Sequence, residues 1–222
     1  MTVTRRNMVL AASGLALAGG ADMRVADGRL DVVRSAHAAG IDAAELNKPG
    51  PLGDKVLGAE TAKVTIIEYA SMTCPHCAAF HTETLPKLKE KYIDTGLVKL
   101  IFREFPLDPL AAGASILARC APGDRYFPMI DVLYRLQRNW AAANDPVAAL
   151  LQIARQTGFT QESFEACLRN QSLLDGVNAE RDRASRRFGV SSTPTLFING
   201  QVYRGALSFD ELDKIVGPMV AG

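Results

Sequence analysis

Apolar, β-branched runs and helix-like segments alternate in the first half of the chain. Residues 63–70 read KVTIIEYA and residues 97–103 read LVKLIFR, and both patterns predict buried strands. Between them, residues 78–92 carry apolar side chains at a helical spacing, with an expected kink at Pro86. This order predicts a βαβ unit whose two strands are parallel.

The pattern changes over residues 108–188, where Ala, Leu, Gln and Arg dominate and no strand pattern occurs. Gly, Pro and Asn positions near residues 121–123, 144–146, 157–158 and 170 interrupt this stretch. We therefore predict four or five helices, inserted after the βαβ unit as a separate helical domain.

Strand character returns near the end of the chain. Residues 195–198 and 201–204 flank Asn199-Gly200, a dipeptide typical of tight hairpin turns. Residues 208–219 predict a closing helix with Ser208 as its N-cap. Residues 63–107 and 189–222 are thus expected to form one α/β domain around the helical insertion at 108–188.

The N-terminal segment has the pattern of an export signal. Two adjacent arginines precede an uncharged apolar run, residues 8–21, which is shorter than the roughly 20 residues that cross a bilayer as a helix. The paired arginines look like a twin-arginine signal. We favour cleavage after Ala38 over the site at residues 16–18, which makes residues 1–38 a predicted signal peptide and residues 39–62 an extended lead-in. The alternative is a short buried helix at the start of a cytosolic domain.

Composition and charge narrow the range of functions. The 222 residues are 48% hydrophobic and carry a formal net charge of +1, which is ordinary for a globular protein. This charge offers no strong field to hold nucleic acid or an anionic membrane, so we expect neither as a partner. Four cysteines are too few for a small disulfide scaffold, but they suffice for one redox pair and one structural bridge.

The most informative motif is Cys74-Pro75-His76-Cys77, which follows the first predicted strand and begins the next helix. A C-x-x-C motif in this position is typical of thiol–disulfide exchange. Pro75 suits the first helical turn, and it leaves Cys74 at the helix N-terminus, where free N–H groups favour a thiolate. A protonated His76 would add positive charge. We therefore predict that Cys74 is the nucleophile with a lowered pKa, and that Cys77, one turn deeper, resolves mixed disulfides.

Other uses of these cysteines remain open at this point. A structural disulfide between Cys74 and Cys77 is possible in an exported protein, and two thiolates could hold Cu(I) in a copper chaperone. A zinc site would need a second C-x-x-C or paired histidines, whereas Cys120, Cys167 and His81 stand alone in the sequence. A c-type haem motif would need histidine directly after Cys77, where the chain has alanine. We therefore expect no metal and no dissociable cofactor.

A carboxylate interrupts the first predicted strand at Glu68, six residues before Cys74. Burying a carboxylate is costly unless it has a partner or a function. Glu68 could carry protons to and from Cys77. Alternatively, it is a residue at the end of a strand that reaches solvent.

Two further cysteines, Cys120 and Cys167, lie in the predicted helical insertion. In a cytosolic protein they would be buried small hydrophobes. In an oxidising compartment an even pair more often forms a bridge, so we favour a structural disulfide.

Three segments together resemble the DsbA-like family, which are exported bacterial thiol:disulfide interchange proteins. The resemblance covers about residues 50–220. It rests on Gly53-Asp54-x-Val56-Leu57-Gly58, on Glu68-x-x-Ser71-x-x-Cys74-Pro75-His76-Cys77, and on Thr193-Pro194-Thr195-Leu196-Phe197-Ile198-Asn199-Gly200. The family implies a thioredoxin fold with an inserted helical domain.

The resemblance also gives Thr193-Pro194 a meaning that an ordinary turn before a strand would not have. It implies that Pro194 is a cis-proline packed against the C-x-x-C motif, and that Thr193 contacts a bound peptide. It further implies that His76 stabilises the thiolate. The best-known oxidase of the family has valine in place of Thr193, and threonine occurs in isomerases and specialised relatives.

The expected activity is therefore that of a periplasmic, monomeric thiol:disulfide oxidoreductase acting mainly as an oxidase. Its substrates would be reduced, unfolded exported proteins, and the family implies reoxidation by a DsbB-like membrane quinone reductase. Isomerase or reductase activity at the same site is the nearest alternative, and the copper chaperone is a more distant one.

Overall fold

The computed structural model describes residues 22–26, 29–33 and 42–222, in two units that are considered separately. In the first unit, β1 (Asp22–Ala26) and β2 (Arg29–Val33) pair antiparallel. Apart from these two strands, the predicted signal peptide (residues 1–38) lies outside the described residues. The signal peptide therefore stays a prediction. Within the described part of the chain, no helix is long and apolar enough to span a membrane.

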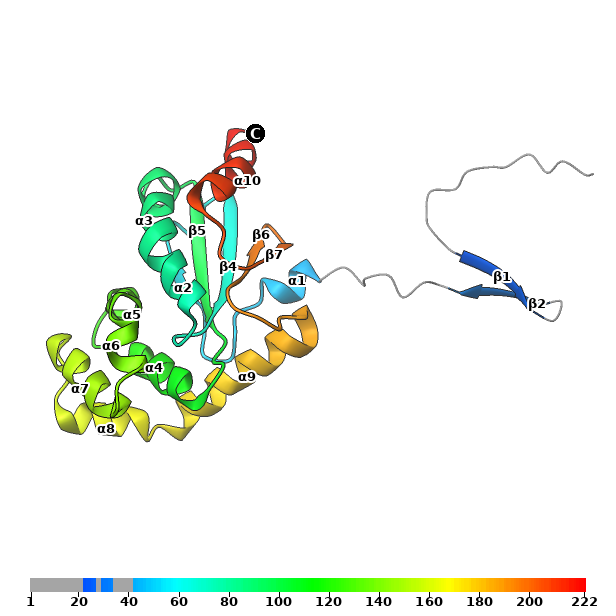
Figure 1. Cartoon of the computed structure of the whole chain (residues 1–222). Coiled ribbons are helices and arrows are strands. Elements are labelled where there is room, and N and C mark those ends of the chain that lie inside the picture. Colours follow the sequence, from blue (N-terminus) through cyan, green and yellow to red (C-terminus); the bar gives the residue numbers. More distant parts are fainter. Residues whose placement is uncertain (1–21, 27–28, 34–41) are drawn as a thin grey trace, which may run out of the picture. The chain divides into compact units, whose positions relative to one another are not determined.

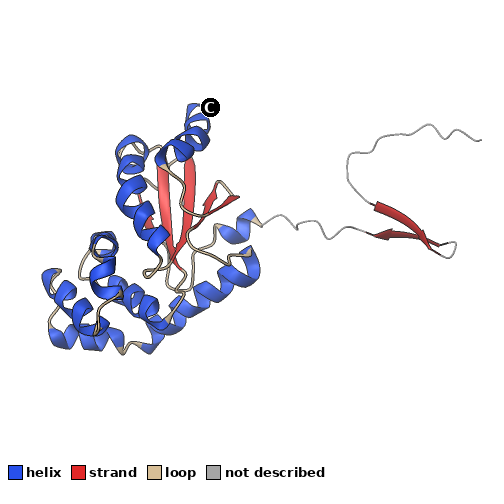
Figure 2. Cartoon of the chain, viewed as in Figure 1, coloured by secondary structure: helices blue, strands red, loops and turns tan. Residues whose placement is uncertain are grey.

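The second unit is built on a five-stranded mixed sheet with the order β3-β5-β4-β6-β7 (Figures 1 and 2). The strands are β3 (Lys55–Leu57), β4 (Val64–Ala70), β5 (Val98–Glu104), β6 (Thr195–Ile198) and β7 (Gln201–Arg204). β4 and β5 are parallel, which confirms the βαβ unit, and the other pairs are antiparallel. The β6–β7 turn has positive φ at Asn199 and Gly200, as the hairpin prediction requires.

The expectation of an extended lead-in at residues 39–62 is wrong in part. This stretch contains the short helix α1 (Ala43–Leu46) and the edge strand β3, which pairs with β5. Arg103 of β5 fixes the segment further, because its guanidinium donates to the carbonyls of Leu46 and Lys48. Elements this short carry too little periodicity to be detected in a sequence rich in Gly and Pro.

The helix after the C-x-x-C motif is continuous but not uniform. It runs through α2 (Pro75–Ala79), the π-helical turn η1 (Phe80–Thr84), α3 (Leu85–Leu88) and the π-helical turn η2 (Lys89–Ile93). Pro86 lies at the start of α3, directly after the first π-helical turn. A π-helical turn changes the hydrogen-bond register and so accommodates a residue that lacks an N–H.

The helical insertion contains six helices, one more than the upper limit predicted, in residues 108–188, which the structure describes throughout. They are α4 (Pro109–Arg119), α5 (Tyr126–Arg135), α6 (Gln137–Ala141), α7 (Pro146–Gln156), α8 (Gln161–Leu168) and α9 (Gln171–Phe188). The additional break is at Leu136, between α5 and α6, where no Gly or Pro marks it. The closing helix α10 (Phe209–Ala221) has the predicted Ser208 cap, which forms a capping box with Glu211.

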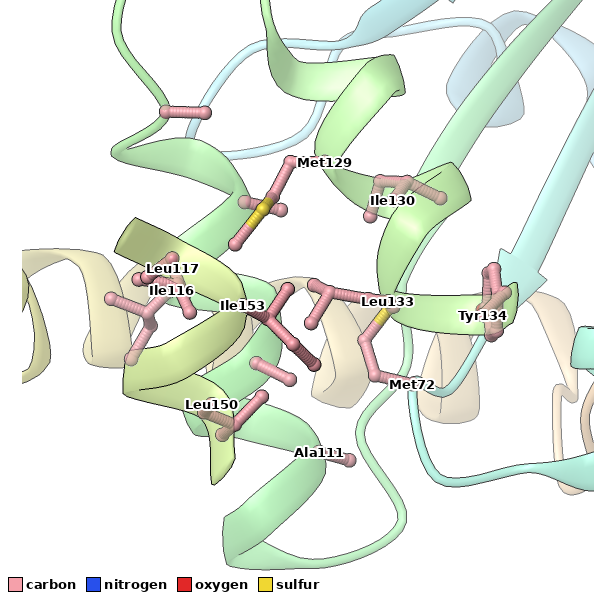
Figure 3. Close-up of a cluster of buried hydrophobic side chains, with 14 of the residues drawn as sticks. Met72, Ala111, Ile116, Leu117, Met129, Ile130, Leu133, Tyr134, Leu150 and Ile153 are labelled. Carbon is pink, nitrogen blue, oxygen red and sulfur yellow. The ribbon is translucent and has the colours of Figure 1, made fainter. Parts of the chain in front are cut away.

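Alternation along β4 divides the apolar side chains between the two faces of the sheet. Ile66 packs with residues of η1, α3 and α10, whereas Ile67 packs with residues of α1 and α9. A third core fills the helical insertion, where side chains of α4, α5 and α7 converge and Met72 reaches in from the loop after β4 (Figure 3). Cys74 and Cys77 belong to this third core, so the motif lies where the sheet domain meets the insertion.

Candidate active site

Cys74 follows β4 closely and is the N-cap residue of α2. Its backbone is extended (φ −78°, ψ 119°), and helical geometry begins at Pro75. The backbone N–H of Cys77 donates to Sγ of Cys74 at 3.4 Å. The start of α2 thus brings unpaired backbone N–H groups close to one sulfur atom, as expected for an anion site at the N-terminus of a helix.

This environment makes Cys74 acidic. Its pKa is lowered from 9.0 to about 5, first by a hydrogen bond from the Cys77 side chain, with the backbone N–H groups of Cys77 and His76 adding to the effect. Burial opposes this shift. A thiol with this pKa is a thiolate at neutral pH, the form that attacks disulfides.

Cys77 behaves in the opposite way. It is fully buried, and desolvation raises the pKa of its thiol strongly, with the Glu68 carboxylate and Cys74 adding to the effect. Cys77 therefore stays protonated while Cys74 is ionised. Residue Cys74 is 5% exposed and Cys77 is 0% exposed, so a substrate reaches Cys74 first and the two thiols have unequal chemical roles.

The Thr193–Pro194 peptide bond is cis and lies against the motif. Sγ of Cys74 lies 3.3 Å from the backbone carbonyl oxygen of Thr193, to which it donates when it is protonated. The Thr193 hydroxyl oxygen is buried and has no hydrogen-bond partner among the described residues. These contacts bring together two segments that are 119 residues apart in the chain.

Glu68 does not reach solvent, so that alternative is wrong. Its side chain is 0% exposed, and one carboxylate oxygen, Oε2, lies 2.9 Å from Nε2 of His81. The other, Oε1, has no hydrogen-bond partner among the described residues. This pairing could not be predicted from the sequence, because His81 alone fits no motif.

Pro75 and His76 are the exposed half of the motif. Because α2 begins at Pro75, the backbone N–H of His76 is available to the Cys74 sulfur. Their exposure leaves both side chains free to contact an incoming protein.

Two residues of the helical insertion support the motif and were not predicted. The Gln137 side chain donates to the carbonyls of Met72 and Cys74, at 2.8 and 2.9 Å. The Tyr134 hydroxyl donates to the carbonyl of Ser71 at 3.2 Å. Neither lies in a recognisable motif, and each is more than 60 residues away in sequence from its partner.

Cys120 and Cys167 form a disulfide with a Cα–Cα distance of 6.1 Å. It links the C-cap of α4 to α8 and so lies within the helical insertion. Cys74 and Cys77 are both free thiols. In the part of the chain that the structure describes, no three His, Cys, Asp or Glu residues are grouped as metal ligands.

The family model described as thioredoxin matches residues 52–217. The chain belongs to the thioredoxin family. The crystal structure of α-DsbA1 from Wolbachia pipientis is 31% identical in sequence, with a TM-score of 0.75, over 81% of this chain and 96% of that one. The predicted fold class, a thioredoxin fold with an inserted helical domain, is thereby confirmed, and the chain is DsbA-like.

Two further relatives of this DsbA-like chain are informative. A Rickettsia bellii protein named as a protein-disulfide oxidoreductase is 34% identical over 148 residues, which cover 66% of this chain and 57% of that protein. The chain thus spans somewhat more than half the length of this relative. The crystal structure of a protein-disulfide isomerase from Novosphingobium aromaticivorans is 25% identical, with a TM-score of 0.68, over 76% of this chain and 98% of that one.

Proposed function

We propose that this DsbA-like chain is a thiol-disulfide oxidase that transfers a Cys74–Cys77 disulfide to reduced proteins newly exported to the periplasm. The observation that carries the proposal is the unequal acidity of the two thiols. Cys74 has a pKa of about 5, whereas burial raises that of Cys77. Stabilising the thiolate favours the reduced form, which makes the disulfide a strong oxidant.

The reaction follows from the positions of the two sulfurs. A substrate thiolate attacks Sγ of Cys74 in the oxidised protein, a mixed disulfide forms, and Cys77 leaves and takes up a proton. A second substrate thiol then attacks the substrate sulfur of the mixed disulfide and releases Cys74 as a thiolate. Two electrons pass from substrate to protein, so no dissociable cofactor is needed.

In this proposal the substrate meets the exposed Pro75 and His76 and the half-buried Thr193, whose position is set by its cis bond to the buried Pro194. The Thr193 carbonyl oxygen is 3.3 Å from Sγ of Cys74, so it lies where a peptide attached to that sulfur would pass. A backbone contact of this kind does not depend on substrate sequence, which suits an enzyme that acts on many unfolded chains.

Reoxidation by a DsbB-like membrane quinone reductase completes the cycle. This partner and the periplasmic location rest on the DsbA-like relatives and on the twin-arginine-like N-terminus. We propose that the chain acts as a monomer.

Oxidative refolding of a reduced, unfolded protein tests the oxidase directly. The wild-type oxidised chain should form disulfides in the substrate, and Cys74→Ser should abolish this activity because it removes the sulfur that is attacked. Oxidation at the wild-type rate by the Cys74→Ser variant would refute the proposal. Cys120→Ala together with Cys167→Ala is the matched control, since it removes the other two cysteines and should leave the reaction intact.

Isomerase activity at the same site is the second candidate. Threonine before the cis-proline and the likeness to the Novosphingobium protein-disulfide isomerase favour it. Reactivation of a protein with scrambled disulfides, catalysed faster than its oxidative refolding, would favour the isomerase over the oxidase.

A further inference from the structure

The buried pair of Glu68 and His81 lies on the side of the sheet that the C-x-x-C helix covers. Glu68 comes from β4 and His81 from η1, and both side chains are at most 3% exposed. Glu68 is close enough to Cys77 that its charge raises the pKa of that thiol. Oε1 of Glu68 has no hydrogen-bond partner among the described residues, so it can accept the proton that Cys77 loses.

His81 also lines a cavity of about 540 Å³ between the helix after the motif and α5. Leu85 and Pro86 form part of one wall, and Phe127 and Ile130 form part of the other. Charged side chains of Lys89, Asp131 and Arg135 also line it. His81 thus contacts the buried carboxylate and, at the same time, a cavity large enough for several waters.

The two ring nitrogens of His81 have different surroundings. Nε2 faces Glu68, whereas Nδ1 makes no hydrogen bond to any of the described residues. The ring is held in place by Tyr134, whose ring centroid is 4.4 Å away, and by Phe102 at 5.5 Å. The titratable or charged groups around the pair are Cys77, Tyr126 and Tyr134, with Lys89, Asp131 and Arg135 lining the cavity.

We propose that His81 relays protons between Glu68 and the water of this cavity, and that this path serves Cys77. The proposal rests on the proposed function, because only thiol–disulfide exchange requires Cys77 to lose and regain a proton. It assigns the cavity beside α5 as the proton exit of the site.

The proton path can be followed through one reoxidation. The Cys74 thiolate attacks an external disulfide, forms a mixed disulfide and expels a thiolate. Cys77 gives its proton to Glu68 and attacks the Cys74 sulfur, which forms the internal disulfide and expels the second thiolate. Glu68 passes the proton to Nε2 of His81, and Nδ1 releases its own proton to the cavity water. Substrate oxidation returns a proton along the same path in reverse, so each full cycle restores the starting tautomer of His81.

Stopped-flow mixing of reduced protein with glutathione disulfide separates the two steps. Formation of the mixed disulfide depends on glutathione disulfide concentration, and the attack by Cys77 does not. We expect His81→Gln, which can still donate a hydrogen bond to Glu68, to leave the first step unchanged. It should slow the second step by about 10- to 100-fold at neutral pH and change its pH profile, because general acid–base groups contribute on about this scale.

Controls separate a relay from a structural role. Lys89→Gln removes a titratable group of the same cavity that is paired with Asp94, and it should leave both steps unchanged. Added imidazole should restore the second step in His81→Ala, whereas pyrrole, which has a similar shape but no basic nitrogen, should not.

Three outcomes would overturn the proposal: a wild-type second step in His81→Gln, an equal slowing of both steps in that variant, or rescue of His81→Ala by pyrrole. Failure of the wild-type protein to form any mixed disulfide would instead refute the proposed function.

Discussion

The side-chain nitrogen of Gln137 lies 2.9 Å from the carbonyl oxygen of Cys74 and 2.8 Å from that of Met72. Gln137 is in α6, so the helical insertion holds the backbone of the nucleophile with a buried amide. The insertion therefore contributes to the geometry of the site as well as covering it. This contact also couples the stability of the insertion to that of the motif.

Gln137→Ala should destabilise the reduced protein by about 1–3 kcal/mol, because it leaves a buried carbonyl without its partner. Urea unfolding measures the loss. Asn139→Ala is the matched control, since Asn139 is an exposed residue of the same helix. Equal midpoints for the two variants would show that the Gln137 contacts contribute no stability.

Reduced protein should gain stability as pH rises. Cys74 has a folded-state pKa of about 5 and an ordinary value of 9.0, so folding releases a proton between these limits. The contribution is complete above about pH 9 and is lost as pH falls through about 5. Well below its ordinary pKa of 9.0, Cys77 is protonated in both states and adds no slope, whereas near that value its ionisation in the unfolded chain opposes any further gain. A flat difference in unfolding free energy between wild type and Cys74→Ala across this window would contradict the assignment.

Cys77→Ala should raise the pKa of Cys74 above about 5, because the Cys77 side chain is the largest single stabiliser of the thiolate. Mixed disulfides with substrate should also accumulate, since no buried thiol is left to displace the substrate. Ultraviolet absorbance of the thiolate gives the pKa, and non-reducing gels show the trapped species. An unchanged pKa would mean that the backbone N–H groups alone lower it.

Removing the second bridge with Cys120→Ala and Cys167→Ala should lower the free energy of unfolding by up to about 4 kcal/mol, the chain-entropy value for a loop of this length. The two residues are 47 apart in sequence, so the bridge closes a long loop within the insertion. Urea unfolding of the double variant measures the loss, and the pKa of Cys74 should stay near 5. Unchanged stability would show that the bridge has no structural role.

The fold could be predicted from the sequence wherever a local pattern was long or chemically specific. The strands around the C-x-x-C helix, the Asn199-Gly200 hairpin and the Ser208 cap all had such patterns. Strands β1, β2 and β3 and helix α1 are three to five residues long, too short for a hydrophobic period to stand out. The boundary at Leu136 carries neither Gly nor Pro, so the sequence offered no break there.

The site was predictable in its motif but not in its supports. The position of Cys74 at a helix start follows from four consecutive residues and the strand before them. Gln137 and Tyr134 reach the site through tertiary packing from helices whose local sequence carries no chemical motif. His81 lies in the helix of the motif itself, but its partner Glu68 is on a strand 13 residues earlier. Their polar atoms become recognisable only when burial shows that each must have a partner.

The reduction potential of the Cys74–Cys77 pair, measured by equilibration with glutathione, tests the central claim most directly. The acidity of Cys74 predicts a value well on the oxidising side of thioredoxin, closer to the about −120 mV of DsbA than to the about −270 mV of thioredoxin. A value near about −270 mV would contradict the account, because it would mean that the thiolate at Cys74 does not favour the reduced form.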